Sequence, residues 1–86
     1  MKLYLLTQTE HNGYDTYDAC IVCAENEEDA KTISPVYNYD TKDNTFREDH
    51  TWDEWASKIE FITCKEIGEA NSNIPRGLIL ASYNAG

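Results

Sequence analysis

The sequence predicts a small α+β domain in which a four-stranded, mostly antiparallel sheet carries a helix on one face. Three observations predict this fold. Apolar segments of strand length lie near both ends of the chain, an Asn-Gly pair separates the first two of them, and a segment that opens with acidic residues lies between the strand pairs. With 86 residues, the chain has room for one domain, which we expect to span residues 1–86.

The first strand pair is predicted from residues 2–9 and 14–24. The segment KLYLLTQT is short, apolar and aromatic, which is typical of a strand. Asn12-Gly13 is the strongest short hairpin signal, so the return strand is expected to begin at Tyr14. The second half of that strand is continuously apolar, which predicts a central position in the sheet beneath a helix.

A helix is predicted to follow at residues 27–34. Asn26 is a favourable N-cap, and the acids at 27–29 stabilise the positive end of the helix dipole. Ser34-Pro35 is expected to end the helix, because a residue before proline avoids the α region. Residues 36–49 are irregular and predict a long loop, with an extended piece at 36–39.

The second half of the chain predicts a short helix and a second hairpin. Thr51 and Glu54 match a capping box, so residues 52–57 are expected to be helical. Trp52 and Trp55 are three residues apart and would share a face that packs on the sheet. The order of elements is then strand, strand, helix, short helix, strand, strand, with the last two strands at residues 59–69 and 78–83 and a Pro- and Gly-containing turn at 71–77.

The charge balance restricts the classes of partner. Lys and Arg total 7 and Asp and Glu total 16, which gives a formal net charge of −9. Direct nucleic-acid binding is not expected, because it requires Lys and Arg to neutralise phosphates. No membrane span is expected, because no apolar run approaches about 18 residues. We read residues 1–6 as a strand rather than a signal peptide, and expect a cytoplasmic protein.

The three cysteines, Cys20, Cys23 and Cys64, are expected to be reduced, because their number is odd and no signal peptide is recognised. Cys20 and Cys23 have the spacing of a CxxC motif, but they lie in a predicted strand. Side chains alternate along a strand, so the two sulfurs should point to opposite faces. The main expectation is three small apolar thiols, with no metal and no cofactor. A metal or redox site that uses these cysteines and a histidine is kept as an alternative.

Catalytic motifs are not found, and the chain is not expected to be an enzyme. The sequence has no GxSxG, no HExxH and no Gly-rich phosphate loop. His50 with Asp49 and Asp53 is one alternative acid–base or metal cluster. The segment from Asp40 to Thr51 fails as a calcium loop at its third, sixth and twelfth positions.

Acid-flanked tyrosines are the candidate partner-binding residues. Tyrosine is enriched at interface hot spots, and a neighbouring carboxylate suits a surface that holds Arg or Lys through cation–π contact and ion pairing. Such pairs occur in the segments YDTYD and YNYD. The candidate residues are Tyr14, Asp15, Tyr17, Asp18, Tyr37, Tyr39 and Asp40.

Three segments carry a resemblance to a group of proteins: MKLYLLTQ, YDTYDACIVCAENEEDAKTISP and KEIGEANSNIPRGLILASYNAG. They resemble small, acidic proteins encoded by tailed phages and prophages. The resemblance covers both ends of the chain and not residues 36–58. It implies a protein made in a bacterial host cytoplasm. Some small acidic phage proteins, including anti-CRISPR proteins, inhibit host defence by binding a nuclease complex.

Two functional hypotheses follow, the first as the main expectation and the second as its alternative. In the first, the chain is a binding module that occupies a basic, nucleic-acid-facing surface of a host protein, such as a nuclease complex, and acts as an inhibitor or partial DNA mimic. In the second, it is a structural or regulatory homo-oligomer. Unblunted edge strands, or an apolar face of Leu78, Ile79 and Leu80, would then be shared between two copies.

Overall fold

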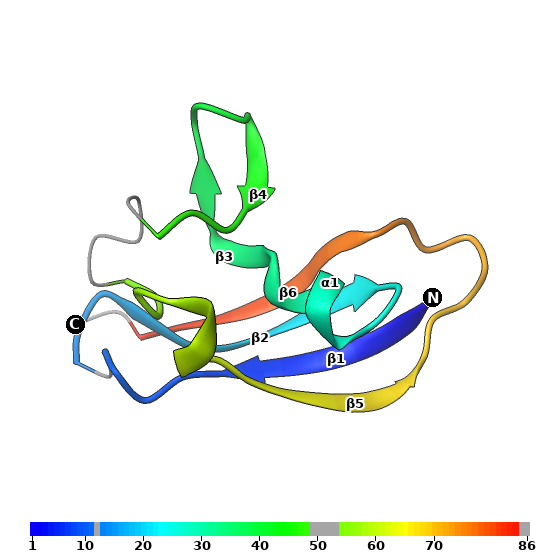
Figure 1. The fold of residues 1–86 in the computed structure, drawn as a ribbon, viewed down its shortest axis with the longest axis horizontal. Coiled ribbons are helices and arrows are strands. Elements are labelled where there is room, and N and C mark those ends of the chain that lie inside the picture. Colours follow the sequence, from blue (N-terminus) through cyan, green and yellow to red (C-terminus); the bar gives the residue numbers. More distant parts are fainter. Residues whose placement is uncertain (12, 49–53, 85–86) are drawn as a thin grey trace.

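The computed structural model describes residues 1–11, 13–48 and 54–84. Its largest unit is a four-stranded antiparallel sheet of order β5-β1-β2-β6 (Figure 1). The two central strands are the first two in the chain, and the last two flank them. The strands are β1 (Lys2–Thr7), β2 (Thr16–Ala24), β5 (Thr63–Glu69) and β6 (Gly77–Asn84).

The alternation of side chains along β1 and β2 creates the core. Tyr4 pairs with Val22, and Leu6 pairs with Cys20. Directly paired residues point to the same face, so these four side chains lie together, and each is at most 3% exposed. This side of the sheet, on which Tyr4, Leu6, Cys20 and Val22 lie, is called the core face below.

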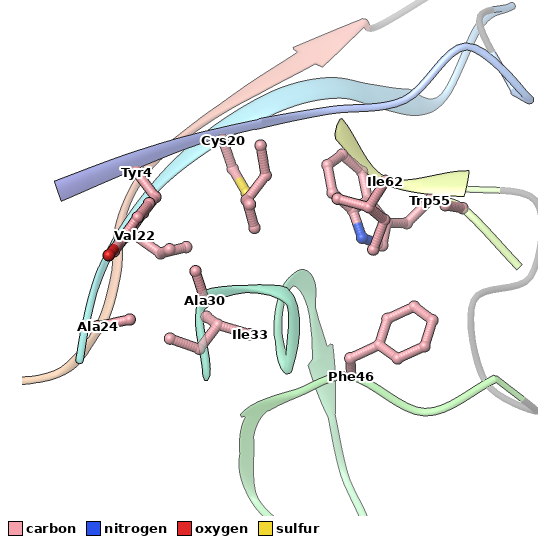
Figure 2. Close-up of a cluster of buried hydrophobic side chains, with 11 residues drawn as sticks. Tyr4, Cys20, Val22, Ala24, Ala30, Ile33, Phe46, Trp55 and Ile62 are labelled. Carbon is pink, nitrogen blue, oxygen red and sulfur yellow. The ribbon is translucent and has the colours of Figure 1, made fainter. Parts of the chain in front are cut away.

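The core face is covered by a layer with little regular structure. Figure 2 shows Ala30, Ile33, Phe46, Trp55 and Ile62 on one side of β1 and β2, together with the core-face residues. Trp55 is fully buried there. The regular elements of the cover are α1 (Glu27–Lys31), β3 (Ile33–Asn38), β4 (Asp43–Thr45) and the 3-10 turn η1 (Ile59–Phe61).

Helix α1 begins as the sequence predicts and ends earlier. The Asn26 side-chain oxygen accepts a hydrogen bond from the Asp29 backbone N–H at 2.8 Å, which is the expected N-cap contact. The helix ends at Lys31 rather than at Ser34. Ile33, Ser34 and Pro35 are buried and belong to β3, so packing of this segment replaces the last predicted helical turn.

Strands β3 and β4 form a separate two-stranded antiparallel sheet, which we call the hairpin. It replaces most of the loop predicted for residues 36–49, and its distal end projects away from the four-stranded sheet (Figure 1). The turn at its tip includes Lys42, which has a positive φ of 59°. The prediction of an extended piece at 36–39 overlaps the end of β3.

One predicted hairpin is wrong, and the connection of the other is longer than predicted. Strands β5 and β6 do not form a hairpin: they lie at opposite edges of the sheet, so residues 70–76 cross from one edge to the other. β1 and β2 pair as the predicted hairpin, but their connection spans residues 8–15 rather than 10–13, and Asn12 lies outside the described residues. Gln8 organises this connection, because its side chain donates to the carbonyls of His11 and Tyr17 and accepts from the His11 N–H.

The second predicted helix is not found in the part of it that the structure describes. Residues 54–57 form a turn and bends, while Thr51, Trp52 and Asp53 lie outside the described residues. The first residues of the predicted strand 59–69 form η1 instead, and β5 starts at Thr63. The chain is therefore mostly β, with a four-stranded antiparallel sheet and little helix, which confirms the sheet and not the α+β balance that the sequence predicts.

Candidate functional site

The first group of candidate residues lies where β2 begins and β6 ends. Tyr14 is 79% exposed and precedes β2, and Asp18 is exposed within β2. Asp15 adopts a positive φ of 59°, and its backbone N–H donates to the Asn84 carbonyl at 2.6 Å. The turn before β2 is therefore attached to the end of β6.

Tyr17 and Asp15 share a partner that the sequence did not single out as a site residue, Tyr83 on β6. The Tyr17 and Tyr83 rings lie 4.8 Å apart at an interplanar angle of 56°, and the Tyr83 hydroxyl donates to Asp15 Oδ1 at 3.1 Å. Burial, with the Asp15 hydrogen bond as a smaller cause, raises the pKa of Tyr83. Its position opposite Tyr17 in the register depends on sheet order, which the sequence leaves open.

The second group lies near the tip of the hairpin. Tyr37 is 45% exposed and Tyr39 is 83% exposed, and their rings meet edge to face with centroids 4.9 Å apart. Asp40 follows directly and accepts from Arg47 Nη1 at 2.8 Å. The turn is held by Asn38, whose Oδ1 accepts from the Asp40 and Thr41 backbone N–H groups.

The structure does not join the two groups into one patch. The hairpin tip projects from one side of the molecule, and the turn before β2 lies at the end of the four-stranded sheet (Figure 1). We call them the hairpin-tip group (Tyr37, Tyr39, Asp40) and the sheet-end group (Tyr14, Asp15, Tyr17, Asp18). Each places tyrosine beside carboxylate, as the sequence suggests, but a partner would meet them as separate contacts.

An ion pair that the sequence analysis missed joins α1 to the start of β6. Arg76 Nε and Nη2 donate to the Asp29 carboxylate at 2.8–3.0 Å, and Nη2 also donates to Thr32 Oγ1 at 2.9 Å. Hydrogen bonds from Arg76 and from the Glu25 backbone N–H lower the pKa of Asp29. Arg76 also lines a polar hollow of about 440 Å³ together with Asp43 and Asn44. The 47-residue separation of Arg76 and Asp29 leaves no local sequence signal for this pair.

The cysteines are placed as the strand alternation predicts, with Cys20 and Cys23 on opposite faces of β2. Cys20 lies in the core, and burial raises its pKa to about 12. Cys23 pairs with Leu3 on the other face, and its Sγ lies 3.8 Å from the Ile74 carbonyl. Cys64 is half-buried, and burial also raises its pKa. Raised pKa values keep thiols protonated, which disfavours nucleophilic chemistry at Cys20 and Cys64.

The described part of the chain does not gather residues into a metal site. Within residues 1–11, 13–48 and 54–84, no three His, Cys, Asp or Glu side chains gather as a metal site. Asp49, His50 and Asp53, the alternative cluster, lie outside those ranges. Asp43 Oδ1 accepts from Thr41 Oγ1 at 2.6 Å and from the Thr45 N–H at 2.9 Å, so this carboxylate stabilises the hairpin turn.

Comparisons with known proteins do not assign this chain to a family. No protein-family model, no curated protein and no solved structure matches this chain. None of the helices among the described residues is long and apolar enough to cross a membrane. The class that the fold itself defines is a small, acidic, mostly β domain with tyrosine- and carboxylate-bearing turns at two separate places.

Proposed function

We propose that this protein is an acidic protein-binding module that uses the hairpin-tip group to occupy a basic, nucleic-acid-facing surface of another protein. The observation that carries the proposal is the exposed Tyr37–Tyr39 pair next to Asp40 on a projecting hairpin. Tyr39 is 83% exposed and gains little from folding, so its large apolar surface is available to a partner.

The chemistry of the hairpin tip suits arginine and lysine side chains. A cation placed over a tyrosine ring is attracted by about 0.5–2 kcal/mol, depending on how far the contact is desolvated. The edge-to-face packing of Tyr37 and Tyr39 holds both rings in defined orientations, which reduces the entropy lost on binding. The adjacent Asp40 carboxylate is exposed but already paired with Arg47 Nη1 at 2.8 Å, so a partner cation would share it with Arg47.

The charge of the whole chain favours the same class of partner. A net charge of −9 accelerates encounter with a basic surface and opposes encounter with an acidic one. Surfaces that bind nucleic acid are rich in Lys and Arg, so they are the complementary targets. Occupying such a surface would exclude nucleic acid, and the module would act as a stoichiometric inhibitor or a partial DNA mimic.

The resemblance to small phage proteins suggests where the partner is found. We propose a host nucleic-acid-binding protein or nuclease complex in the bacterial cytoplasm, which includes the anti-CRISPR type of target. The sheet-end group would form a second contact, because Tyr14 and Asp18 are exposed while Tyr17 and Asp15 are held by Tyr83. No catalytic step and no cofactor are part of the proposal.

The proposal is tested by capture from a bacterial lysate followed by measurement of affinity. Tagged protein is used as bait, bound proteins are released by salt, and the recovered protein is purified and titrated with the bait. The double variant Tyr37→Ala/Tyr39→Ala is expected to weaken binding at least about tenfold. Phe61→Ala is the matched control, because Phe61 is 47% exposed, close to Tyr37 at 45%, and lies in η1.

The electrostatic part of the proposal has its own test. Asp18→Lys changes the charge at an exposed position, and it should weaken binding at low salt and flatten the dependence of affinity on salt. Affinity that is equal at low and moderate salt for the unmodified protein would overturn the electrostatic mechanism. Equal losses for the Tyr37/Tyr39 variant and the Phe61 control would overturn the assignment to the hairpin.

A further inference from the structure

The face of the sheet opposite the core has an apolar centre. The register places Leu5 opposite Ile21, which is opposite Leu80, so these three side chains point to the same side. Leu3 and Ala19 belong to the same set through their positions in β1 and β2. We call this surface the open face and define its centre as Leu3, Leu5, Ala19, Ile21 and Leu80.

The open face lacks the cover that the core face has. Leu80 is 63% exposed, and Leu5, Ala19 and Ile21 are only half-buried. Sheet residues, Leu5, Ile21 and Leu80 among them, line a shallow hollow of about 330 Å³ here. At one end of this face, the connection between β5 and β6 contacts the sheet, and the Ile74 carbonyl lies 3.8 Å from Cys23 Sγ.

The charges around the open face differ from those of the rest of the molecule. The register positions that border its centre hold Thr7, Thr63, Lys65 and Ser82. None of the paired register positions described on this face is acidic, although the chain has 16 Asp and Glu residues, and Asp18 stands unpaired next to Ala19 near the start of β2. A basic partner would therefore be drawn to other surfaces, whereas two copies can bring this face together without opposing two carboxylate clusters.

The edges of the sheet are less suited to pairing than the open face. β5 and β6 are the edge strands, and each has a β-bulge in its register with the neighbouring central strand. The residues left unpaired are Ile67, between partners Glu66 and Gly68, and Ile79, between partners Leu78 and Leu80. A second irregularity in the β2–β6 pairing leaves Asp18 of β2 unpaired between Tyr17 and Ala19. Bulges twist an edge and interrupt its hydrogen-bonding groups, which opposes edge-to-edge addition of a second sheet.

We propose that two copies of this chain pack their open faces together as a symmetric, sandwich-like dimer. Each copy has four strands about 4.8 Å apart, with six to nine residues at about 3.3 Å per residue. The sheet face of one copy therefore measures about 400–550 Å², without the extra surface of the protruding side chains. That area is near the lower limit for a specific interface, so the dimer is expected to dissociate at micromolar concentration. Two-fold symmetry brings the same residues of both copies into one interface, with the sheets crossing at about −30°.

The dimer differs from the shared apolar surface of Leu78, Ile79 and Leu80 that the sequence suggests. Leu78 packs against the core cluster and Ile79 lies at the bulge, so Leu80 is the member of that run at the centre of the open face. The proposal does not rest on the proposed function, because the hairpin tip is outside the open face. A dimer would present two hairpins to a partner.

The test is sedimentation of the purified full chain from about 1 μM to about 1 mM, with the variants Leu80→Glu and Tyr39→Glu. The unmodified protein should shift from monomer to dimer, and Leu80→Glu should weaken dimerisation at least about tenfold, because like charges meet at the interface. Tyr39→Glu adds the same charge at an exposed aromatic position on the hairpin and should leave dimerisation unchanged. Circular dichroism establishes that both variants are folded.

A second variant keeps the test decisive if Leu80→Glu loses structure. Leu80→Lys is made as well, and the two Leu80 variants are mixed, which should restore association through opposite charges if the open faces meet. A monomer at every concentration would overturn the proposal and leave the face for a different apolar partner. Dimerisation that Tyr39→Glu abolishes and Leu80→Glu does not would also overturn it.

Discussion

The two faces of the central sheet are built from alternate residues of the same strands, yet their surroundings differ strongly. On the core face, Leu6 and Val22 are fully buried beneath the cover. On the open face, their neighbours Leu5 and Ile21 are only half-buried, and Leu80 is 63% exposed. Similar aliphatic side chains, one position apart, should therefore contribute different amounts to the stability of the single chain.

This difference shows how much the fold depends on segments outside the sheet. Both faces of the central strands carry apolar side chains, and one becomes the core because Ala30, Ile33, Phe46, Trp55 and Ile62 lie against it (Figure 2). Most of these residues come from turns, short strands and bends rather than from a long helix. The open face has no comparable cover among the described residues, and this is the basis of the proposed dimer.

The largest expected effect compares Leu6→Ala with Leu5→Ala. Leu6→Ala removes a fully buried side chain and should lower the free energy of unfolding by about 2–5 kcal/mol, because lost apolar burial and a cavity both contribute. Leu5→Ala, one position away on the half-buried face, should cost less than half as much. Urea unfolding at a low protein concentration, where the chain is monomeric, measures both values.

The matched pair also provides the control for the comparison. Both substitutions make the same chemical change in the same central strand, so differences in strand propensity cancel. Equal losses at low concentration would mean that both faces are covered in solution, and that the comparison is wrong. If the loss of unfolding free energy for Leu5→Ala grows with protein concentration, the difference between the two faces is supported, because that additional loss would come from the dimer.

A smaller effect concerns the beginning of helix α1, which belongs to the cover. Asn26→Ala removes the oxygen that accepts from the Asp29 N–H at 2.8 Å, and it should lower the free energy of unfolding by about 0.5–2 kcal/mol. Asn26→Asp retains an acceptor and should lose much less. Thermal or urea unfolding of the two variants measures the difference, and equal losses would show that the cap does not stabilise the cover.

The parts of the fold that the sequence predicts are those with local signals. The short apolar and aromatic segment KLYLLTQT, the apolar run of β2 and the N-cap at Asn26 are all contained in a few neighbouring residues, and the structure confirms the two strands and the cap. The opposite orientation of Cys20 and Cys23 follows from the same alternation. Predicting these features does not depend on the order of the strands in the sheet.

One error comes from a local signal, because the capping box predicts a helix at 52–57 and the described residues 54–57 form a turn and bends. The other errors are in features that depend on tertiary contacts. A turn-like NSNIPRG segment predicts a β5–β6 hairpin, but sheet order places these strands at opposite edges. Pro35 is typical of a helix end, but burial of the segment around Ile33 makes a strand there. Tyr83 joins the sheet-end group only because β6 pairs with β2. The candidate site could be predicted as residue types and not as contacts.

The smallest expected effect concerns the ion pair that attaches the cover to β6. Arg76→Ala removes the hydrogen bonds to Asp29 and Thr32 and should lower the free energy of unfolding by about 0.2–1 kcal/mol at neutral pH, because Arg76 is half-exposed. Arg76→Lys keeps the charge but not the paired geometry, so it should recover only part of the loss.

The pH dependence of that loss identifies its cause. Arg76 lowers the pKa of Asp29, so its contribution is fully present above the carboxyl's unfolded pKa of about 3.9 and is lost as the pH falls through the lower folded value. The stability difference between the unmodified protein and Arg76→Ala should therefore narrow below about pH 4, and urea unfolding from pH 7 to pH 2.5 measures it. Arg76 also lowers the pKa of Asp43, as the smallest of several causes, so Asp43 adds to the same narrowing, while carboxyls that Arg76 does not affect cancel in the difference. A gap that stays constant down to pH 2.5 would assign the effect of Arg76 to packing against Thr32 and the β5–β6 connection instead of to the charge of Asp29.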